Sequence, residues 1–226
     1  MARIKTDYEW DGAGAEREFK RAFELNPNYA TAHQWYALHL GNTGQADEAI
    51  REAQRAQELD PLSLSINTTL GWTLLFARRY DEAIAQFRKT LEMDPNFADA
   101  LFAIARPYEA KKMFAEAIAT TQKAIQLDDD PKLLAYLGHI YAVSGRKADA
   151  LNILSELAKL SKEKTVFADD IAAIYVGLGE KDKAFDYLEK AYQERSQGLR
   201  TLRVDERLDI LRDDPRFQDL LQRIGL

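Results

Sequence analysis

A four-residue phrase that ends in proline recurs every 34 residues in the first half of the chain. The phrases read Glu-Leu-Asn-Pro, Glu-Leu-Asp-Pro and Glu-Met-Asp-Pro, and they end at Pro27, Pro61 and Pro95. Alanine keeps nearly the same period along most of the chain, at Ala15, Ala49, Ala83, Ala117, Ala150 and Ala184. A fixed period of this length indicates one small structural unit that is repeated and stacks on its neighbours, because a single unit cannot bury its apolar face alone.

Each unit reads as two helices joined by a turn. Apolar and small residues lie three and four positions apart in the first half of a unit, as at Leu70, Gly71 and Leu74, which is typical of a helix. A glycine then marks the turn in several units, for example Gly145, where a tight connection often needs a positive φ. The alanine series lies on the second helix, and proline ends that helix. We name the two helices of a unit A and B.

Small residues also occupy one fixed position of helix A. These residues are Ala37, Gly71, Ala105, Gly138 and Ala172. Small side chains on facing helices let the two backbones approach closely, and larger neighbours such as Leu70, Leu74 and Phe87 fill the space beside them. We therefore expect helices A and B of each unit to pack tightly at the glycine or alanine of helix A.

This pattern resembles the tetratricopeptide repeat (TPR) family over about Gly12 to Arg195. Two departures are visible: the usual tryptophan of helix A is absent from every unit, and Arg78 and Lys112 stand where the turn glycine is usual. The resemblance implies an all-α fold, a right-handed α-α superhelix (a TPR solenoid) with a C-terminal capping helix. It also implies that the A helices line the concave face of that superhelix.

The period divides the chain into segments of one solenoid domain, residues 1–226. The N-terminal segment 1–29 holds a lone B helix, about Gly12–Leu25, and five full units follow: 30–63, 64–97, 98–130, 131–164 and 165–198. The segment 199–226 breaks the period. Asp214 and Pro215 start a one-faced helix there, and we expect it to cover the exposed end of the stack. Pro107 falls inside an A helix and predicts a kink, or a helix start shifted toward Arg106.

Composition excludes several classes of protein. Of the 226 residues, 46% are hydrophobic and 30% are charged, so the chain can bury a core. The absence of cysteine excludes disulfides, thiol nucleophiles and cysteine-based zinc sites. A net charge of −6 gives no general basic face for nucleic acid. The longest uncharged stretch, Pro61–Ala77, is polar in part and shorter than the ~20 apolar residues of a membrane span.

The sequence contains no arrangement typical of catalysis. Neither a Gly-x-Ser-x-Gly nor a P-loop motif is present. His33 and His39 are not four residues apart, as a helical metal pair would be, and His139 is distant in sequence. We therefore expect no catalytic residue, no metal site, no cofactor and no enzymatic activity.

The A helices predict a concave binding groove with aromatic side chains. Tryptophan, tyrosine and arginine are the residues that most often anchor interfaces. The candidate groove residues are Gln34, Trp35, Leu38, Thr68, Trp72, Phe76, Phe102, Arg106, Lys132, Tyr136 and His139. Trp72, Phe102 and Arg106 should form one patch, in which Arg106 would pair with an acidic group of the partner.

We interpret the chain as a non-enzymatic scaffold that binds a protein or peptide, without direct contact to nucleic acid or membrane. The phrase from Leu211 to Phe217 resembles the close of C-terminal TPR regions in multidomain bacterial transcriptional regulators and serine/threonine kinases. That resemblance implies the interaction module of a larger bacterial regulator, in the cytoplasm, or in the periplasm where the parent spans a membrane. The alternative that stays open is a self-assembling module that forms homo-oligomers. A small-ligand or enzymatic role would need a closed pocket with convergent titratable groups, and the sequence shows no sign of one.

Overall fold

A computed structural model describes residues 2–5 and 10–226, and within them the regular structure is helical with no strand. Five consecutive pairs of A and B helices follow one another along the chain. The A helices are α3 (Ala30–Asn42), α5 (Leu64–Phe76), α7 (Ala98–Ala110), α9 (Pro131–Val143) and α11 (Ala168–Gly177). The B helices that follow them are α4 (Ala46–Leu59), α6 (Tyr80–Met93), α8 (Phe114–Leu127), α10 (Lys147–Leu160) and α12 (Lys181–Gln193). The all-α superhelical fold is confirmed.

The first long helix of the chain is of B type. Helix α2 runs over Gly12–Leu25, and the carboxylate of Asp11 caps it by accepting a hydrogen bond from the amide of Gly14 at 2.8 Å. A short helix, α1 (Ala2–Ile4), precedes it and contacts it. Residues 1 and 6–9 of the segment 1–29 lie outside the described residues.

The turn between helices A and B has the same backbone conformation in all five units. Glycine holds a positive φ at Gly44, Gly145 and Gly179, with values of 86°, 83° and 78°. Arg78 and Lys112 occupy the same place with φ of 61° and 60°. The fold therefore imposes the left-handed conformation on two side chains that disfavour it.

The close approach of helices A and B explains the small residues of helix A. A Cβ atom added to Gly71 would lie 2.2 Å from the ring of Phe87, and one added to Gly138 would lie 2.7 Å from Ile153. Ala83, in the alanine series, is fully buried. Gly71 therefore makes room for the aromatic ring of helix B, and the close contact is between glycine and a large side chain.

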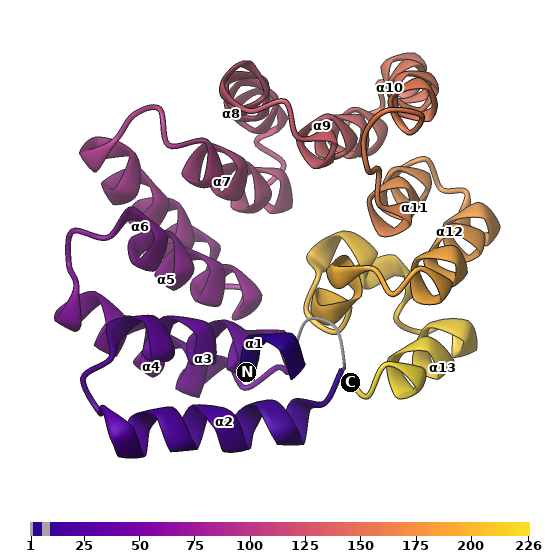
Figure 1. Cartoon of the computed structure of the whole chain (residues 1–226). Coiled ribbons are helices and arrows are strands. Elements are labelled where there is room, and N and C mark those ends of the chain that lie inside the picture. Colours follow the sequence, from indigo (N-terminus) through magenta and orange to yellow (C-terminus); the bar gives the residue numbers. More distant parts are fainter. Residues whose placement is uncertain (1, 6–9) are drawn as a thin grey trace.

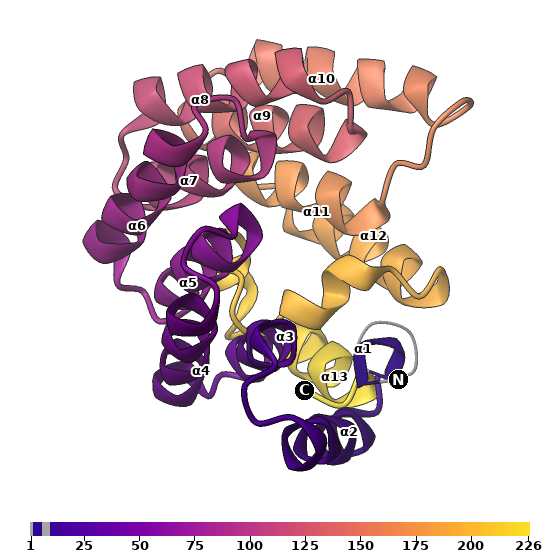
Figure 2. The same ribbon diagram turned by 60° about the vertical axis from the view of Figure 1, so that its left-hand side comes forward.

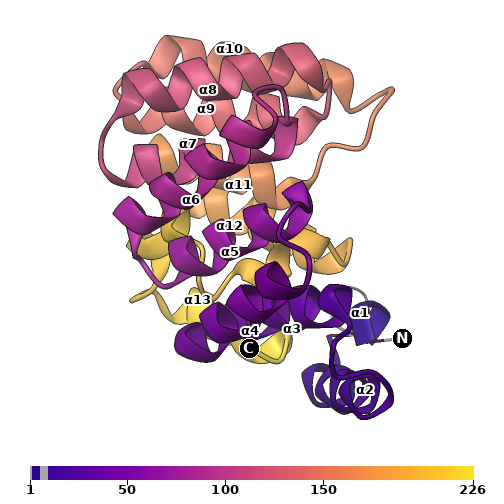
Figure 3. The same cartoon turned by 90° about the vertical axis from the view of Figure 1, so that its left-hand side faces the viewer.

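The helix pairs curve into a superhelix with the A helices on its inner side and the B helices outside (Figure 1). Viewed from the side, consecutive pairs stack on one another along the superhelix (Figure 3). The largest core cluster runs between units, from Ala37 and Ile50 through Leu75 and Phe87 to Ile140. Helix α7 runs through Pro107 from Ala98 to Ala110, so the expected shift of the helix start toward Arg106 is wrong.

The C-terminal segment does more than cover the end of the stack. Helix α13 (Pro215–Arg223) packs Phe217 and Leu220 against Leu188 of α12, as expected of a capping helix. The residues before it turn back into the concave side as two short 3-10 helices, η2 (Gln197–Thr201) and η3 (Glu206–Leu211). Figure 1 shows this part of the chain inside the curve of the A helices. We call residues 196–212 the inner segment.

The two ends of the described chain meet. Trp10 stacks on Tyr192 with ring centroids 5.6 Å apart, and both rings pack against the apolar cluster that includes Ile224 of the C-terminus. The C-terminus lies beside α1 and α2 in both views (Figures 1 and 2). The superhelix is therefore closed on itself through its terminal segments. Among the described residues, no helix combines the length and apolar character needed to cross a membrane.

Candidate binding cavity

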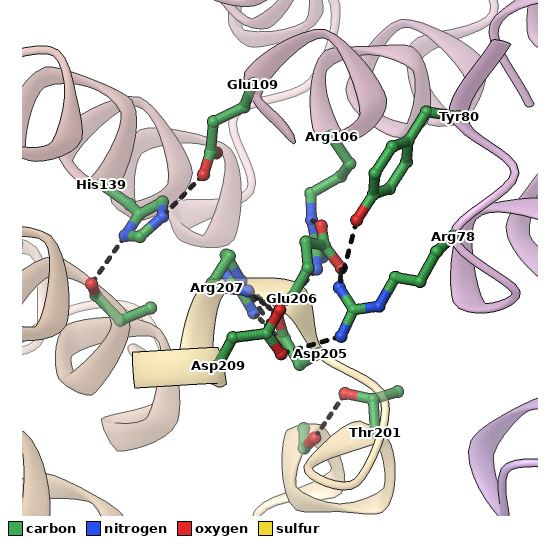
Figure 4. Close-up of polar contacts among 12 residues, drawn as sticks. Arg78, Tyr80, Arg106, Glu109, His139, Thr201, Asp205, Glu206, Arg207 and Asp209 are labelled. Atoms are coloured by element: carbon green, nitrogen blue, oxygen red, sulfur yellow. Dashed lines mark hydrogen bonds and ion pairs between the residues drawn. The ribbon is translucent and has the colours of Figure 1, made fainter. Parts of the chain in front are cut away.

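A buried ion-pair network fixes the inner segment to the concave face (Figure 4). Arg106 of α7 donates from Nη2 to Oδ1 of Asp205 at 2.8 Å and from Nε to Oε1 of Glu206 at 2.7 Å. Arg207 donates to both carboxylate oxygens of Asp205, from Nη2 to Oδ2 at 2.6 Å. At the exposed edge of the network, Arg78, in the turn after α5, donates to Oδ1 of Asp209 at 2.8 Å. The inner segment thus bridges two units, through contacts that span 99 residues for Arg106 with Asp205 and 131 residues for Arg78 with Asp209.

The charges of this network stabilise one another. Burial alone would raise the pKa of Asp205, but Arg106 and Arg207 hold it well below its usual range. Burial would likewise lower the pKa of Arg106, and Asp205 and Glu206 raise it instead. The side chains of Arg106 and Asp205 are 6% and 4% exposed. A buried pair of this kind strongly destabilises the fold when one partner is removed, because the other charge is left unpaired.

Two residues of α9, Tyr136 and His139, are buried beside this network. Tyr136 is 1% exposed, and the guanidinium carbons of Arg106 and Arg207 lie 5.7 and 5.9 Å from its ring centre. His139 is also 1% exposed; its Nδ1 donates to the carbonyl oxygen of Ala173 at 2.6 Å, and its Nε2 lies 2.9 Å from Oε1 of Glu109. His139 lowers the pKa of Glu109, although burial alone would raise it. Tyr136, His139 and Glu109 therefore form a buried polar layer beneath the surface of the concave face.

The inner segment leaves a cavity of about 560 Å³ on the concave face; its lining runs along the whole of α3 and α5 and includes the starts of α9 and α11. Helices α3, α5 and α7 form one wall, and the start of α11 with the inner segment forms the other. Half-buried aromatic rings line the first wall. The ring of Trp72 lies 6.0 Å from that of Phe102 and 5.7 Å from that of Phe76, centre to centre.

The structure gathers most of the predicted groove residues around this cavity. The lining includes Gln34, Trp35, Leu38, Thr68, Trp72, Phe76, Phe102, Arg106 and Lys132. Tyr136 and His139 do not line it, because the inner segment and neighbouring helices bury them. Trp72, Phe102 and Arg106 lie together, with the guanidinium carbon of Arg106 5.7 Å from the Trp72 ring centre. Arg106, however, pairs with acidic groups of its own chain, where we expected an acidic group of a partner.

Several lining residues carry no signal in the helix-A pattern. They come from the loops before the A helices and from the inner segment; examples are Phe97, Asp130, Phe167, Arg200 and Arg207, whereas Asp169 and Asp170 lie on the groove-facing side of an A helix and follow the repeat pattern. Phe167 is 41% exposed, which is unusual for an aromatic ring beside a cavity wall. Phe167 directly precedes α11, at a position that the repeat pattern does not mark as part of the groove.

Polar side chains on the wall are held in position by their neighbours. Gln34 donates from Nε2 to Oγ of Ser65 at 2.6 Å and to Oγ1 of Thr69 at 3.1 Å. The ammonium group of Lys132 lies 3.3 Å from Oδ2 of Asp130 and 5.7 Å from the ring centre of Phe102. These contacts fix the lining before any ligand enters, and preorganisation of this kind lowers the free-energy cost of binding.

Two neighbouring carboxyl groups at the start of α11 face the cavity. Asp169 accepts a hydrogen bond from the hydroxyl of Ser196. Burial and the adjacent Asp169 raise the pKa of Asp170 to about 8, although Arg207 acts in the opposite direction. Within the described part of the chain, no group of three or more metal-ligating side chains is placed to hold a metal ion.

Comparisons with known proteins agree with this architecture. One tetratricopeptide repeat model matches residues 11–63 and 68–133, and a second matches residues 170–197. No curated protein matches the chain significantly.

Three solved structures illustrate the likeness of fold. PilW, described as a widely conserved type IV pilus biogenesis factor, has a TM-score of 0.64 at 20% identity, covering 97% of this chain and 94% of its own. The structure of the APC/C hetero-tetramer Cut9–Hcn1 gives a TM-score of 0.67 at 16% identity, with coverage of 99% and 48%. A thermophilic TPR protein of Thermus thermophilus gives 0.53 at 16% identity, with coverage of 95% and 89%.

Proposed function

The chain belongs to the tetratricopeptide repeat family, and from that premise we propose that it is a non-enzymatic scaffold that binds an extended segment of a partner protein in the cavity. The observation that carries the proposal is the half-buried aromatic wall of Trp72, Phe76 and Phe102 beside a cavity of about 560 Å³. The chain's own inner segment fills the neighbouring part of the concave face but leaves these rings uncovered.

The size and lining of the cavity support a peptide as the occupant. Ligand pockets measure ~300–1,000 Å³ and combine apolar walls with a few fixed polar groups. The side-chain oxygens of Gln34 and Thr68 would accept hydrogen bonds from the N–H groups of a peptide backbone, next to the rings that would hold its side chains, because the donors of both residues are used within the chain. The lining comes from α3, α5, α7, α9 and α11, so an occupant would contact more than one repeat.

We include in the proposal that the chain acts without catalysis, as the interaction module of a larger bacterial regulator. The phrase from Leu211 to Phe217 supports the second point by its resemblance to the close of such regions. Self-assembly through the ends of the superhelix has less support, because Trp10, Tyr192 and α13 cover the ends with contacts inside one chain.

A peptide selection with the purified chain tests the proposal. Random peptides displayed on phage are selected on the immobilised protein, and the dissociation constants of selected peptides are measured for the wild type and for Trp72→Leu. Replacing the ring with an apolar side chain should weaken binding about thirtyfold or more, since an aromatic anchor contributes ~2 kcal/mol or more. Tyr29→Leu is the control, because Tyr29 is 50% exposed and does not line the cavity.

The far-UV circular dichroism of both variants establishes that they are folded. Selected peptides that bind wild type and Trp72→Leu equally would place the binding surface elsewhere and contradict the proposal. Failure to select any peptide against a folded, monomeric protein would also contradict it.

A further inference from the structure

We infer that the cavity receives a cationic side chain, lysine or arginine, from the bound segment, and that Asp170 with Asp169 is its counter-charge. This inference rests on the proposed function, because it names the chemistry of the peptide that the cavity would hold. Four observations carry it: the engagement of the basic groups of the wall, the unpaired acids, the aromatic rings beside them, and one buried acceptor without a donor.

The basic groups of the wall are engaged within the chain. Arg106 is bound by Asp205 and Glu206, and Arg207 by both oxygens of Asp205. Lys132 lies beside Asp130, with their charged atoms 3.3 Å apart. Arg200 also has a contact within the chain. An acidic peptide would have to compete with these internal partners, which are already at hydrogen-bonding distance.

Asp169 and Asp170, at the start of α11, have no such oppositely charged partner within the part of the chain that the structure describes. Among the contacts of the described residues, Asp169 accepts only from the hydroxyl of Ser196, and no cation lies within ion-pair distance of Asp170. The charged groups that face Asp170 are Asp169, Asp130, Asp205 and Arg207, and Asp205 holds Arg207 on both oxygens. Asp170 is therefore surrounded by three carboxyl groups and by one arginine that is already paired with Asp205. A further positive charge beside Asp170 would stabilise its ionised form.

This environment determines the protonation state of Asp170 when no ligand is bound. Burial and Asp169 raise its pKa to about 8, so the carboxyl group keeps a proton at pH 7. A lysine or arginine side chain entering the cavity would take the place of that proton as the stabilising positive charge. Binding would then release a proton to the solvent, which gives a readout that simple apolar docking lacks.

The rest of the lining fits a cation on an alkyl stem. Aromatic faces attract cations, and Phe102 already lies 5.7 Å from the ammonium group of Lys132. The methylene groups of a lysine or arginine would pack on apolar rings while the charged end meets the acids. Asn42, which is 6% exposed, lines the same cavity, and its Oδ1 has no hydrogen-bond partner among the described residues. A segment with N–H donors would satisfy that acceptor.

Four pools of blocked hexapeptides test the inference on the full chain. Each pool has lysine, arginine, norleucine or glutamate at one central position and random uncharged residues elsewhere. Binding is followed by the fluorescence of the protein, since Trp35 and Trp72 both line the cavity. We expect the lysine and arginine pools to bind at least tenfold more tightly than the norleucine pool, and the glutamate pool most weakly. Calorimetry at pH 7 in buffers of different ionisation enthalpy should show proton release for the lysine and arginine pools and none for the norleucine pool.

Two variants distinguish the loss of the Asp170 carboxylate from the loss of a carboxylate elsewhere on the protein. Asp170→Asn should abolish the tenfold preference for lysine over norleucine and the proton release, whereas Asp213→Asn, a residue outside the cavity, should leave both unchanged. The proton-release measurement on the wild type stands independently if Asp170→Asn does not fold. Norleucine or glutamate pools that bind as tightly as lysine would overturn the inference and leave the proposed function intact, whereas no binding by any pool would overturn both.

Discussion

Lys112 holds a left-handed backbone conformation that glycine holds at the same place in three other repeats. Its φ is 60°, its side chain is exposed, and no ion pair is described for it. We predict that Lys112→Gly raises the free energy of unfolding by about 0.5–1 kcal/mol, because the strain of the Cβ atom exceeds the extra chain entropy of glycine. Urea denaturation measures the change.

Arg78→Gly provides the comparison for that prediction. Arg78 has nearly the same φ, 61°, but it also donates to Asp209 of the inner segment. The relief of strain should be offset there by the lost ion pair, so the gain should be smaller than for Lys112→Gly. A loss of stability in Lys112→Gly would mean that the turn does not impose the strain we assign to it.

The carboxyl group of Asp170 makes stability depend on pH in a defined direction. Its pKa in the folded state is about 8, above the usual value of 3.8, so between these values the folded state holds a proton that the unfolded state has lost. The contribution of this group therefore falls as the pH rises from ~4 to ~8. We predict that Asp170→Asn, which cannot ionise, gains at least ~1 kcal/mol over the wild type between pH 5 and pH 8.

Urea midpoints of both proteins at pH 5, 6, 7 and 8 supply the measurement. Asp213→Asn, a substitution outside the cavity, should follow the wild type at every pH. A constant difference between Asp170→Asn and the wild type across this range would show that Asp170 is ionised throughout, contrary to the account.

The capping helix depends on its apolar face. Leu220 is 3% exposed and belongs to the cluster with Leu188 and Ala191 of α12. We predict that Leu220→Ser lowers the free energy of unfolding by at least ~2 kcal/mol and promotes association, because it leaves a cavity and loosens the cover of an apolar end. Thermal denaturation and light scattering report the two effects.

Gln222→Ser on the same helix is the matched control, because Gln222 is exposed. It should change the melting temperature little and leave the protein monomeric. Equal behaviour of the two variants would mean that α13 does not cover the stack as described.

The periodic elements could be predicted from the sequence, and the inner segment could not. The 34-residue period fixes the register of every helix pair, because each unit makes nearly the same contacts with its neighbours. Residues 196–212 follow no period, and their position depends on contacts such as Arg106 with Asp205, which lie 99 residues apart. A local sequence pattern cannot predict which carboxylate will pair with a given arginine so far away in the chain.

The same reason explains which of the predicted groove residues lie on the cavity wall. Trp72 and Phe102 lie side by side because neighbouring A helices present the same face, and this follows from the repeat alone. Arg106 has the same position on its helix as Trp72, yet it is buried because the inner segment covers it. A charge reversal at Arg106 would therefore test stability, since it would put a third carboxylate beside Asp205 and Glu206.

At the scale of the whole molecule, the concave face of the superhelix is divided between the inner segment and the cavity that we propose as the binding site. The inner segment fills one side through the network of Arg106, Asp205 and Arg207, and the aromatic cavity remains on the other. The shape and charge of the cavity thus depend on the docking of the inner segment. Everything proposed for the cavity therefore requires that Arg106 and Asp205 interact in solution.

A double-mutant cycle on Arg106→Met and Asp205→Asn tests that requirement most directly, with free energies of unfolding from urea denaturation. We predict a coupling of at least ~1 kcal/mol, because removing either partner leaves a buried group unpaired. The exposed pair Arg55 and Glu58, 3.0 Å apart on one helix, serves as the reference and should give no more than ~0.5 kcal/mol. A coupling between Arg106 and Asp205 no larger than this reference would show that the inner segment does not dock on the concave face.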